Sequence, residues 1–277
     1  MEPLTTDDPV TIGPYAVVGV LGTGGMGRVY LADDGRGGQL AVKVIRSELA
    51  GDPGFRARFR REVDAARRVP AAVTAEVIAA DTDIDRPWVA TRYVPGPSLA
   101  ERVRADGPLP PAELTALARG LLDALAAVHA AGLVHRDLKP SNVLLAADGP
   151  RIIDFGIARA ADATRLTVTG HLVGTPSYMS PEQALGAGGL GPATDVFALG
   201  SVLTFAATGE PPFAAATAPG VLFRIVHGEP DLGATPEPVR GLVARCLARD
   251  PADRPDARAL RAALDRPRRR RAGLLAG

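Results

Sequence analysis

The sequence predicts an α+β chain of two unequal lobes, a small β-rich lobe followed by a larger helical lobe. Up to residue 94, short β-branched runs alternate with glycine-rich or polar turns, which is the pattern of hairpins. From residue 98 onward, apolar residues instead recur every three or four positions, which is the period of a helix. Between the two regions lies Pro95-Gly96-Pro97, a composition typical of a boundary between lobes.

The first lobe is expected to hold four strands and one helix. Phe55, Phe59 and Val63 are spaced i, i+4, i+8, so they predict a helix over residues 53–68. Residues 1–10 are predicted to be an N-terminal tail, and the lobe to span residues 11–94. The strands are predicted at residues 15–21, 29–32, 40–45 and 88–94.

The second lobe, residues 95–265, is expected to be the larger one and to consist mainly of helices. Ser98 followed by Glu101 is typical of a capping box at the start of a short helix. Pro111–Ala131 carries leucines along one face and is followed by Gly132, which predicts a long helix and its end. Further helices are predicted at residues 194–208, 219–228, 236–248 and 256–265, with a basic C-terminal tail at 266–277.

Composition excludes several classes of protein. With 46% hydrophobic and 23% charged residues and a net charge of +1, the chain is typical of soluble globular proteins and has no basic excess for nucleic acid. The single cysteine, Cys246, lies in an apolar stretch and is expected to be a buried thiol. An acidic N-terminus argues against a signal peptide, and no apolar run approaches the ~18 residues of a membrane span. The expected location is therefore the cytoplasm.

A glycine cluster is the first motif with a chemical meaning. Its eight residues, Gly22-Thr23-Gly24-Gly25-Met26-Gly27-Arg28-Val29, fit the pattern G-x-G-x-x-G-x-V. Glycines let backbone N–H groups approach phosphates, where a Cβ atom would clash. Alone, the pattern also fits an ordinary hairpin. A strand rather than a helix follows, which disfavours a dinucleotide fold, and no Lys-Ser/Thr pair follows Gly27, as a P-loop requires.

Lys43 is a charged residue within an apolar strand, Ala41-Val42-Lys43-Val44. Glu62 shares the helical face of Phe59 and Ala66, so it is expected to point inward, where an unpaired charge is costly. We expect a Lys43–Glu62 ion pair that also directs the lysine toward phosphates. The alternative is two unrelated surface charges.

Three further motifs decide between these alternatives. His135-Arg136-Asp137-Leu138-Lys139-Pro140-Ser141-Asn142 fits H-R-D-L-x-x-x-N, Asp154-Phe155-Gly156 follows a β-like run, and Ser180-Pro181-Glu182 stands where A-P-E is expected. These are ordered signatures of protein kinases. Over about residues 11–265, the sequence resembles the Hanks-type Ser/Thr protein kinases. The segments Gly24–Gly27, Gly174–Gln183 and Thr208–Phe213 are similar to the bacterial branch.

This resemblance implies a bilobal kinase fold with ATP between the lobes and protein Ser/Thr hydroxyls as acceptors. Asp137 would orient the hydroxyl proton, and Lys139 would stabilise charge on the transferred group. Lys43, held by Glu62, would neutralise phosphate oxygens. The ligands of Mg²⁺, with Mn²⁺ as an alternative, would be Asn142 and Asp154.

The resemblance also implies where the nucleotide binds. The segment Gly22–Val29 would cover the phosphates. The backbone of Arg92 and Val94 would bond adenine, next to Thr91 as gatekeeper. The apolar walls of the adenine site would be Leu21, Val29 and Ala41 above the ring and Leu144 below it.

Supporting residues follow from the same resemblance. Glu182 is expected to pair with Arg254, and Asp195 to hold the backbone of the catalytic loop. His135 is expected to contact Phe155 rather than to act as a base. Two alternatives in function stay open at this point: a pseudokinase that binds ATP without turnover, and a phosphotransferase for small molecules.

Regulation is expected in the activation segment between Asp154 and Glu182. Thr167 and Thr169 are the candidate phosphosites, modified by a second copy of the chain and then paired with Arg136. The arginines within residues 266–271 are a candidate contact with anionic lipid on the inner face of a membrane, and a solvated end is the alternative.

Overall fold

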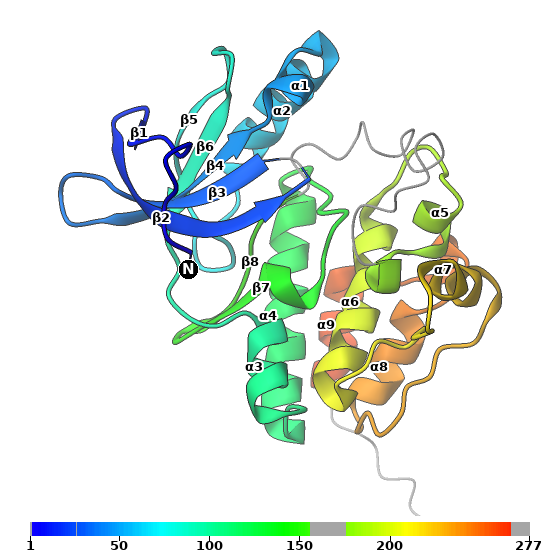
Figure 1. The fold of residues 1–277 in the computed structure, drawn as a ribbon. Helices are drawn as coiled ribbons and strands as arrows, with labels where there is room; N and C mark the ends of the chain where they lie inside the picture. Colours follow the sequence, from blue (N-terminus) through cyan, green and yellow to red (C-terminus); the bar gives the residue numbers. More distant parts are fainter. Residues whose placement is uncertain (1, 26, 156–175, 267–277) are drawn as a thin grey trace, which may run out of the picture.

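A curled six-stranded antiparallel sheet forms the smaller lobe of the computed structural model, which describes residues 2–25, 27–155 and 176–266 (Figure 1). The strand order is β1-β2-β3-β4-β6-β5. All four predicted strands are confirmed, and β1 and β5 add to them. The strands are β1 (Thr11–Ile12), β2 (Tyr15–Gly24), β3 (Gly27–Asp33), β4 (Gln39–Ile45), β5 (Val77–Asp81) and β6 (Trp88–Arg92).

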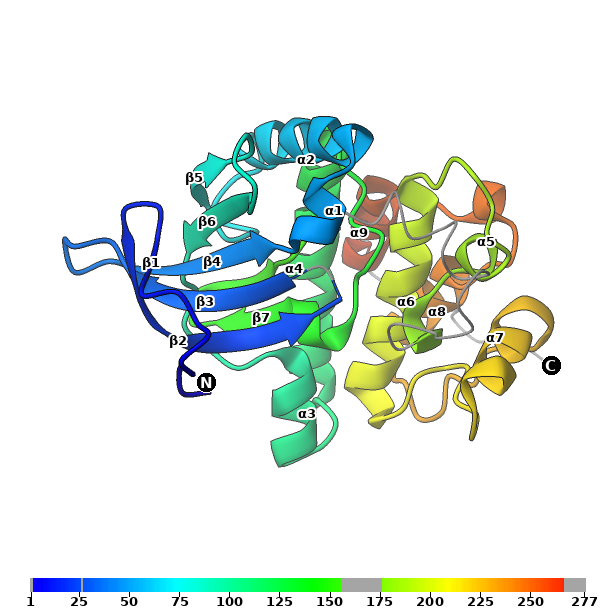
Figure 2. The ribbon, with the colours of Figure 1, turned by 45° about the horizontal axis from the view of Figure 1, so that its top comes forward.

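Two helices follow β4, namely α1 (Ser47–Ala50) and α2 (Pro53–Ala66). Asp52 caps α2 by accepting a hydrogen bond from Gly54 N, and Pro53 occupies the first helical position. Phe55, Phe59 and Val63 are buried along one face, as their spacing predicts. Figure 2 shows α2 lying along the β5–β6 side of the sheet, and its buried face belongs to the apolar core that continues into the larger lobe.

The outer face of the sheet has a small apolar cluster of its own, including Tyr30, Val42 and Trp88. Residues 2–8, predicted to be a tail, lie on this lobe. Glu2 pairs with Val20 as an isolated β-bridge, and the side chain of Asp8 has no exposed surface. The chain therefore begins to contribute to the lobe before its first strand.

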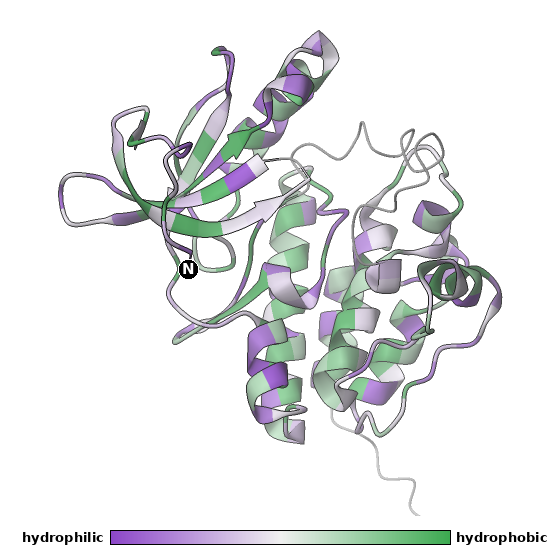
Figure 3. Ribbon diagram, viewed as in Figure 1, coloured by the Kyte–Doolittle hydropathy of each residue, from purple (hydrophilic) through white to green (hydrophobic). Residues whose placement is uncertain are grey.

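The larger lobe is built around α4 (Pro111–Ala130) and α6 (Pro192–Thr208), along which Figure 3 shows mostly apolar residues. Leucines of α4 are fully buried, which confirms the predicted face. Ser98 and Glu101 form the predicted capping box. The other helices are α3 (Leu99–Asp106), α5 (Pro181–Ala184), α7 (Ala218–His227), α8 (Val239–Cys246) and α9 (Ala257–Asp265), with 3-10 helices η1 (Pro140–Asn142), η3 (Pro176–Tyr178) and η4 (Pro251–Asp253).

A hairpin of β7 (Val143–Ala146) and β8 (Gly149–Ile152) lies where the two lobes meet. It is tied to the first lobe by Thr74, whose hydroxyl donates to Ile152 O over 2.8 Å. One continuous apolar core joins α2 of the small lobe to α4 and α6. Within the described residues, no helix is long and apolar enough to cross a membrane. The predicted buried thiol is also found, since Cys246 is fully buried.

Candidate active site

The loop that carries His135, Arg136 and Asp137 is held by a buried carboxylate. Asp195, in the first turn of α6, accepts hydrogen bonds from the backbone N–H groups of His135 and Arg136, each over 2.8 Å. His129 Nε2 lies 2.8 Å from the same carboxylate. Asp195 is fully buried, so these bonds are shielded from water. The predicted role of Asp195 is confirmed.

Two residues of the site adopt left-handed backbone conformations that are rare outside glycine. Arg136 and Asp154 both have φ = 61°. Such conformations cost roughly 1–3 kcal/mol each and persist where the surroundings enforce them. Here His135 contributes, because its Nε2 lies 2.9 Å from Ile153 O and its ring meets Phe155 edge-on at 5.5 Å. The predicted His135–Phe155 contact is confirmed.

Asp137, Lys139 and Asn142 converge on one short segment. Lys139 Nζ lies 2.9 Å from Asp137 Oδ2, and Asn142 Nδ2 donates to Asp137 O over 2.9 Å. The amide nitrogen of Asn142 is used in this bond. Its oxygen accepts only a long hydrogen bond from Ser141 Oγ, at 3.5 Å, and keeps a lone pair for a ligand. The segment thus combines a carboxylate, an ammonium group and an amide oxygen, which suits proton transfer and phosphate chemistry.

Lys43 does not meet its predicted partner. Its ammonium group contacts Asp154 Oδ1, while Glu62 Oε1 lies 3.7 Å from Arg136 Nη1. The predicted Lys43–Glu62 ion pair is therefore wrong for this arrangement of the chain. Glu62 does point inward, as its place on α2 predicts, but the position of α2 brings it to the arginine of the catalytic loop.

The environment of Glu62 is poorly matched to a charge. Its Oε2 atom is buried without a hydrogen-bond partner, and so is Nε of Arg136. Burial raises the pKa of Glu62 to about 7, although Arg136, Arg58 and Arg61 favour the ionised form. The carboxyl group is thus held near its titration point at neutral pH.

Asp154 has the character of a metal ligand. Desolvation opposes its ionisation, but the ammonium of Lys43 outweighs that effect and holds the pKa of the Asp154 carboxyl below its ordinary value. Asp154 and Asn142 supply the hard oxygen donors that Mg²⁺ prefers. Among the described residues there is no cluster of three or more His, Cys, Asp or Glu side chains suited to a metal. These two residues fit a cation that takes its remaining ligands from phosphates and water.

The glycine cluster forms the turn of the β2–β3 hairpin, with Gly22 opposite Val29 and Gly24 opposite Gly27. A Cβ atom on Gly22 or Gly24 would meet no atom within 4 Å, so protein packing does not explain these glycines. A Cβ on Gly27 would lie 1.8 Å from Val44 O, so this glycine is required by the sheet itself. Open space at the first two positions fits a loop that approaches phosphates.

Several of the residues expected around adenine lie on elements next to the segment that joins the lobes. Ala41 is paired with Thr91 across β4 and β6, and the Thr91 hydroxyl donates to Ala41 O over 3.3 Å. Leu144 forms an isolated antiparallel β-bridge with Ser98, which follows the segment that joins the lobes. Among the described residues, no hydrogen bond engages the N–H of Val94, which is therefore available to a ligand. The side chain of Arg92 forms an ion pair with Glu76, with 3.1 Å between Arg92 Nε and Glu76 Oε2.

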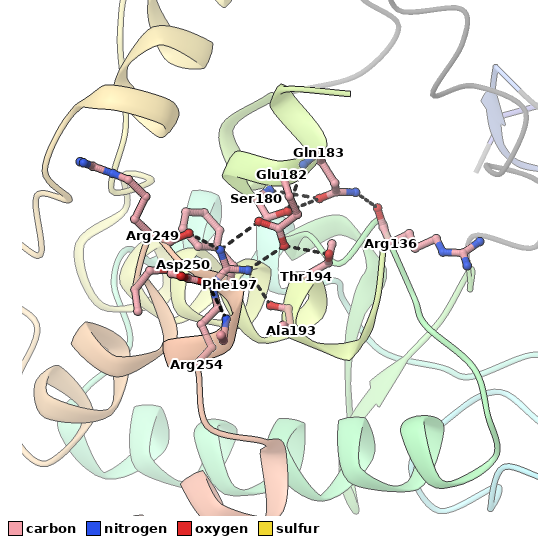
Figure 4. Close-up of polar contacts among 12 residues, drawn as sticks. Arg136, Ser180, Glu182, Gln183, Ala193, Thr194, Phe197, Arg249, Asp250 and Arg254 are labelled. Atoms are coloured by element: carbon pink, nitrogen blue, oxygen red, sulfur yellow. Dashed lines mark hydrogen bonds and ion pairs between the residues drawn. The ribbon is translucent and has the colours of Figure 1, made fainter. Parts of the chain in front are cut away.

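Figure 4 shows the predicted pair of Glu182 and Arg254, with both guanidinium ends facing the carboxylate. The two hydrogen bonds measure 2.7 and 2.9 Å, and the arginine side chain has no exposed surface. Burial opposes ionisation of Glu182, but Arg254 outweighs it, so the pKa of Glu182 is lowered. Arg254 also donates hydrogen bonds to the backbone carbonyl oxygens of Ala193, Ala248 and Arg249.

Two residues near this pair were not predicted. Thr194 donates to Glu182 Oε1 over 2.9 Å, and Gln183 Nε2 donates to Arg136 O over 2.9 Å (Figure 4). Gln183 also completes a capping box with Ser180, which explains why serine suits the first position of this motif. The spacing Ser180-x-x-Gln183 is a capping signal that the sequence shows. Thr194 gives no such signal.

Several predicted residues lie outside the described part of the chain. They are Met26 of the glycine cluster, Gly156 of the Asp-Phe-Gly motif, the candidate phosphosites Thr167 and Thr169, and residues 267–277 of the basic tail.

Comparison with known proteins decides the family, because the protein kinase domain family matches residues 15–263. The chain belongs to this family. It is 51% identical over 264 residues to the serine/threonine-protein kinase AfsK of Streptomyces coelicolor and 52% identical over 255 residues to the probable serine/threonine-protein kinase PkwA of Thermomonospora curvata. These matches cover 95% and 92% of this chain, and 33% and 34% of the two relatives.

The chain thus spans about a third of the length of these curated relatives. Its structure is similar to the kinase domain of Mycobacterium tuberculosis PknI, with a TM-score of 0.72 and 31% identity, covering 94% of this chain and 98% of that one. The predicted resemblance to bacterial Hanks-type Ser/Thr kinases and the predicted bilobal fold are confirmed. Membership of this family implies ATP and a divalent metal ion as cofactors.

Proposed function

We propose that this kinase domain transfers the γ-phosphoryl group of ATP to serine or threonine hydroxyls of proteins. The observation that carries the proposal is the catalytic segment itself. Asp137, Lys139 and Asn142 stand together on a loop fixed by Asp195, and Asp154 is in contact with Lys43 of the opposite lobe. These groups supply what phosphoryl transfer needs, namely positioning and charge neutralisation.

Each group has a distinct part in the reaction. Asp137 accepts the proton of the attacking hydroxyl, and Lys139 stabilises charge on the transferred group. Lys43 contacts phosphate oxygens beneath the glycine hairpin. Asn142 and Asp154 would hold Mg²⁺ or Mn²⁺, and the bound ion would neutralise phosphate charge. Because Glu62 is paired with Arg136 here, we infer that Glu62 exchanges this partner for Lys43 when the enzyme turns over.

The test is the substitution Asp137→Asn, assayed with labelled ATP, Mg²⁺ and a generic basic protein substrate. We expect turnover to fall by roughly 10²–10⁴-fold, because a general base is lost. Nucleotide affinity should stay within a factor of about two, since Asp137 acts on the hydroxyl rather than the nucleotide. Asp85→Asn, at an exposed residue, serves as the control. Turnover within tenfold of the wild type would contradict the assignment.

A pseudokinase that binds ATP without turnover is the alternative. It requires loss of a catalytic group, yet Lys43, Asp137, Asn142 and Asp154 are all present. Labelling of the wild-type chain or of added substrate excludes this alternative. Absence of labelling, together with measurable binding of Mg²⁺-ATP, would favour it.

We also propose activation by phosphorylation of Thr167 or Thr169, carried out by a second copy of the chain. A phosphothreonine brings about −1.5 to −2 charges and three acceptor oxygens, which suits Arg136. Supporting this, Arg136 has only a loose contact with Glu62 and an unpartnered Nε atom. Mass spectrometry of freshly expressed protein should find phosphate on one of these threonines and none in Asp137→Asn protein. Fully active enzyme with both threonines bare would exclude the proposal.

For location, we propose the cytoplasm, with weak attachment to anionic membrane through the arginines of residues 266–271. The support is their charge alone, at about 1 kcal/mol for each basic residue near such a surface. Sedimentation with vesicles should increase with the fraction of anionic lipid. Sedimentation that does not depend on lipid charge would exclude this contact.

A further inference from the structure

The N-terminal segment, residues 2–8, lies on the outer face of the sheet and ends in Asp8. Both carboxylate oxygens of Asp8 are fully used. Oδ1 contacts Arg28 Nη1 and accepts from Tyr30 Oη over 2.9 Å, and Oδ2 accepts from Thr5 N and Thr5 Oγ1 over 2.9 and 2.8 Å. The carboxylate side chain has no exposed surface. A buried anion with this many partners fixes the position of whatever it contacts.

Arg28 carries this contact into the glycine cluster. It lies on β3 directly opposite Thr23 of β2, and its Nε donates to Thr23 Oγ1 over 3.3 Å. Asp8, Arg28 and Thr23 thus form a chain of polar contacts from the N-terminal segment to the hairpin that would cover phosphates. Arg46 adds a second contact on the same hairpin, donating to Gly24 O over 3.2 Å.

Apolar packing does little to hold this end of the hairpin. A hollow of about 320 Å³ lies beside it, lined by Val44 and Ile45 of β4 and by the arginines Arg28, Arg46 and Arg86. Gly22 and Gly24 have no neighbours at the position of a Cβ atom. The pairing of Gly27 with Ile45 and of Arg28 with Val44 holds the β3 strand of the hairpin to the sheet, and the contacts of Arg28 with Asp8 and of Arg46 with Gly24 O add side-chain support to it.

We propose that Asp8 is a positioning residue that holds the glycine hairpin at its distance above the nucleotide phosphates, acting through Arg28. The inference rests on the proposed function only in that the hairpin covers a nucleotide. Residues 2–8 precede the first strand, and this proposal gives them an effect on the affinity for the nucleotide. Asp8 touches neither nucleotide nor substrate, so its effect should fall on binding rather than on chemistry.

The experiment compares Asp8→Asn with Asp7→Asn in the full chain. Asp7 is exposed, and the structure gives it no polar contact within the described residues, so it is a matched control. For Asp8→Asn we expect KM for ATP and Kd for a non-hydrolysable ATP analogue with Mg²⁺ to rise at least fivefold. The value of kcat at saturating ATP should stay within twofold. Asp7→Asn should leave all three values unchanged.

A double-mutant cycle tests the route through Arg28. If Asp8 acts through Arg28, Arg28→Gln should raise Kd as Asp8→Asn does, and the double variant should add less than a twofold further increase. Additive effects would overturn this route. If Asp8→Asn does not fold, Arg28→Gln and Tyr30→Phe are compared in its place. We expect Kd for the ATP analogue to rise in Arg28→Gln and to stay unchanged in Tyr30→Phe. Equal effects of the two substitutions on Kd would contradict the proposal.

The outcomes separate this inference from the proposed function. If Asp8→Asn and Asp7→Asn bind the analogue equally, the positioning role is wrong, whether or not phosphate is transferred. If KM and kcat change together in proportion to lost melting temperature, the role is merely structural, which also overturns it. If the wild type binds the analogue but transfers no phosphate, the proposed function fails while the binding comparison still decides the inference.

Discussion

The two sides of the cleft differ in how well their charged groups are matched. On the side of the larger lobe, Asp195 is fully buried and Glu182 is 15% exposed, and both make hydrogen bonds of 2.7–2.9 Å to their partners. On the side of the smaller lobe, Glu62 meets Arg136 at 3.7 Å and leaves one oxygen without a partner. Both sides use buried carboxylates, yet only one side satisfies them.

The two sides differ in how well their carboxylates are paired because the helices that bear these carboxylates belong to different lobes. Asp195 and Glu182 belong to helices α6 and α5 of the larger lobe, where Asp195 holds the catalytic loop and Glu182 pairs with Arg254 of the same lobe. Glu62 belongs to α2, which reaches across from the smaller lobe, and its partner depends on the position of that helix. We infer that the catalytic loop is assembled in advance, whereas the Lys43–Glu62 side is completed by movement of α2.

The largest effect is expected when the well-matched side is broken by Glu182→Ala. The variant leaves Arg254 buried without its anion, which costs roughly 3–5 kcal/mol for a buried ion pair. Urea denaturation measures the free energy of unfolding. Glu229→Ala, which removes a solvent-exposed ion pair with Arg249 at 3.6 Å, is the control and should cost less than about 1 kcal/mol. Equal losses in the two variants would contradict the comparison.

A smaller effect is expected for Asp195→Asn. One carboxylate oxygen becomes an amide group, so an N–H of His135 or Arg136 loses its acceptor, at a cost of about 1–3 kcal/mol. Because the loop carries Asp137, we also expect kcat to fall at least tenfold. Asp253→Asn, at an exposed position, should change neither quantity. Unchanged kcat in Asp195→Asn would show that the loop does not need this support.

The smallest effect is expected from pH, on the poorly matched side. The pKa of Glu62 is raised from 4.5 to about 7 by burial, so the folded chain binds its proton more tightly than the unfolded chain. Stability should therefore fall as pH rises from about 5 through 7, with a loss of about 1 kcal/mol between pH 6 and pH 8. The charged groups that face Glu62 are Arg136 from the loop and Arg58 and Arg61 from α2.

Glu62→Gln removes the titrating group and should flatten this part of the pH dependence. The measurement is the difference in unfolding free energy between the wild type and Glu62→Gln at pH 6 and pH 8, which cancels the other titrating groups. Glu48→Gln, at an exposed position of α1, is the control and should keep the wild-type slope. If the unfolding free energy of Glu62→Gln still falls between pH 6 and pH 8 as in the wild type, another group is responsible for the pH dependence.

Sequence patterns predicted most of the elements because local rules govern them. The helical period of Phe55, Phe59 and Val63 was enough to place α2, and the Ser98–Glu101 spacing was enough to cap α3. Strand β5 (Val77–Asp81) was not predicted, since its half-buried edge position shows no clear alternation. Residues 2–8 were expected to be a tail because polar residues give no local sign of a tertiary partner.

By itself, the sequence determined which chemical groups this protein has and their order: the glycine hairpin, Lys43, Asp137, Asn142 and Asp154. Motif spacing is local, so it needs no knowledge of packing. Only the tertiary structure decided which partner each buried charge takes. Lys43 lies with Asp154, Glu62 with Arg136, and Asp8 with Arg28. A buried carboxylate requires some cation or donor, but several are within reach, and the relative position of helix, loop and sheet selects one.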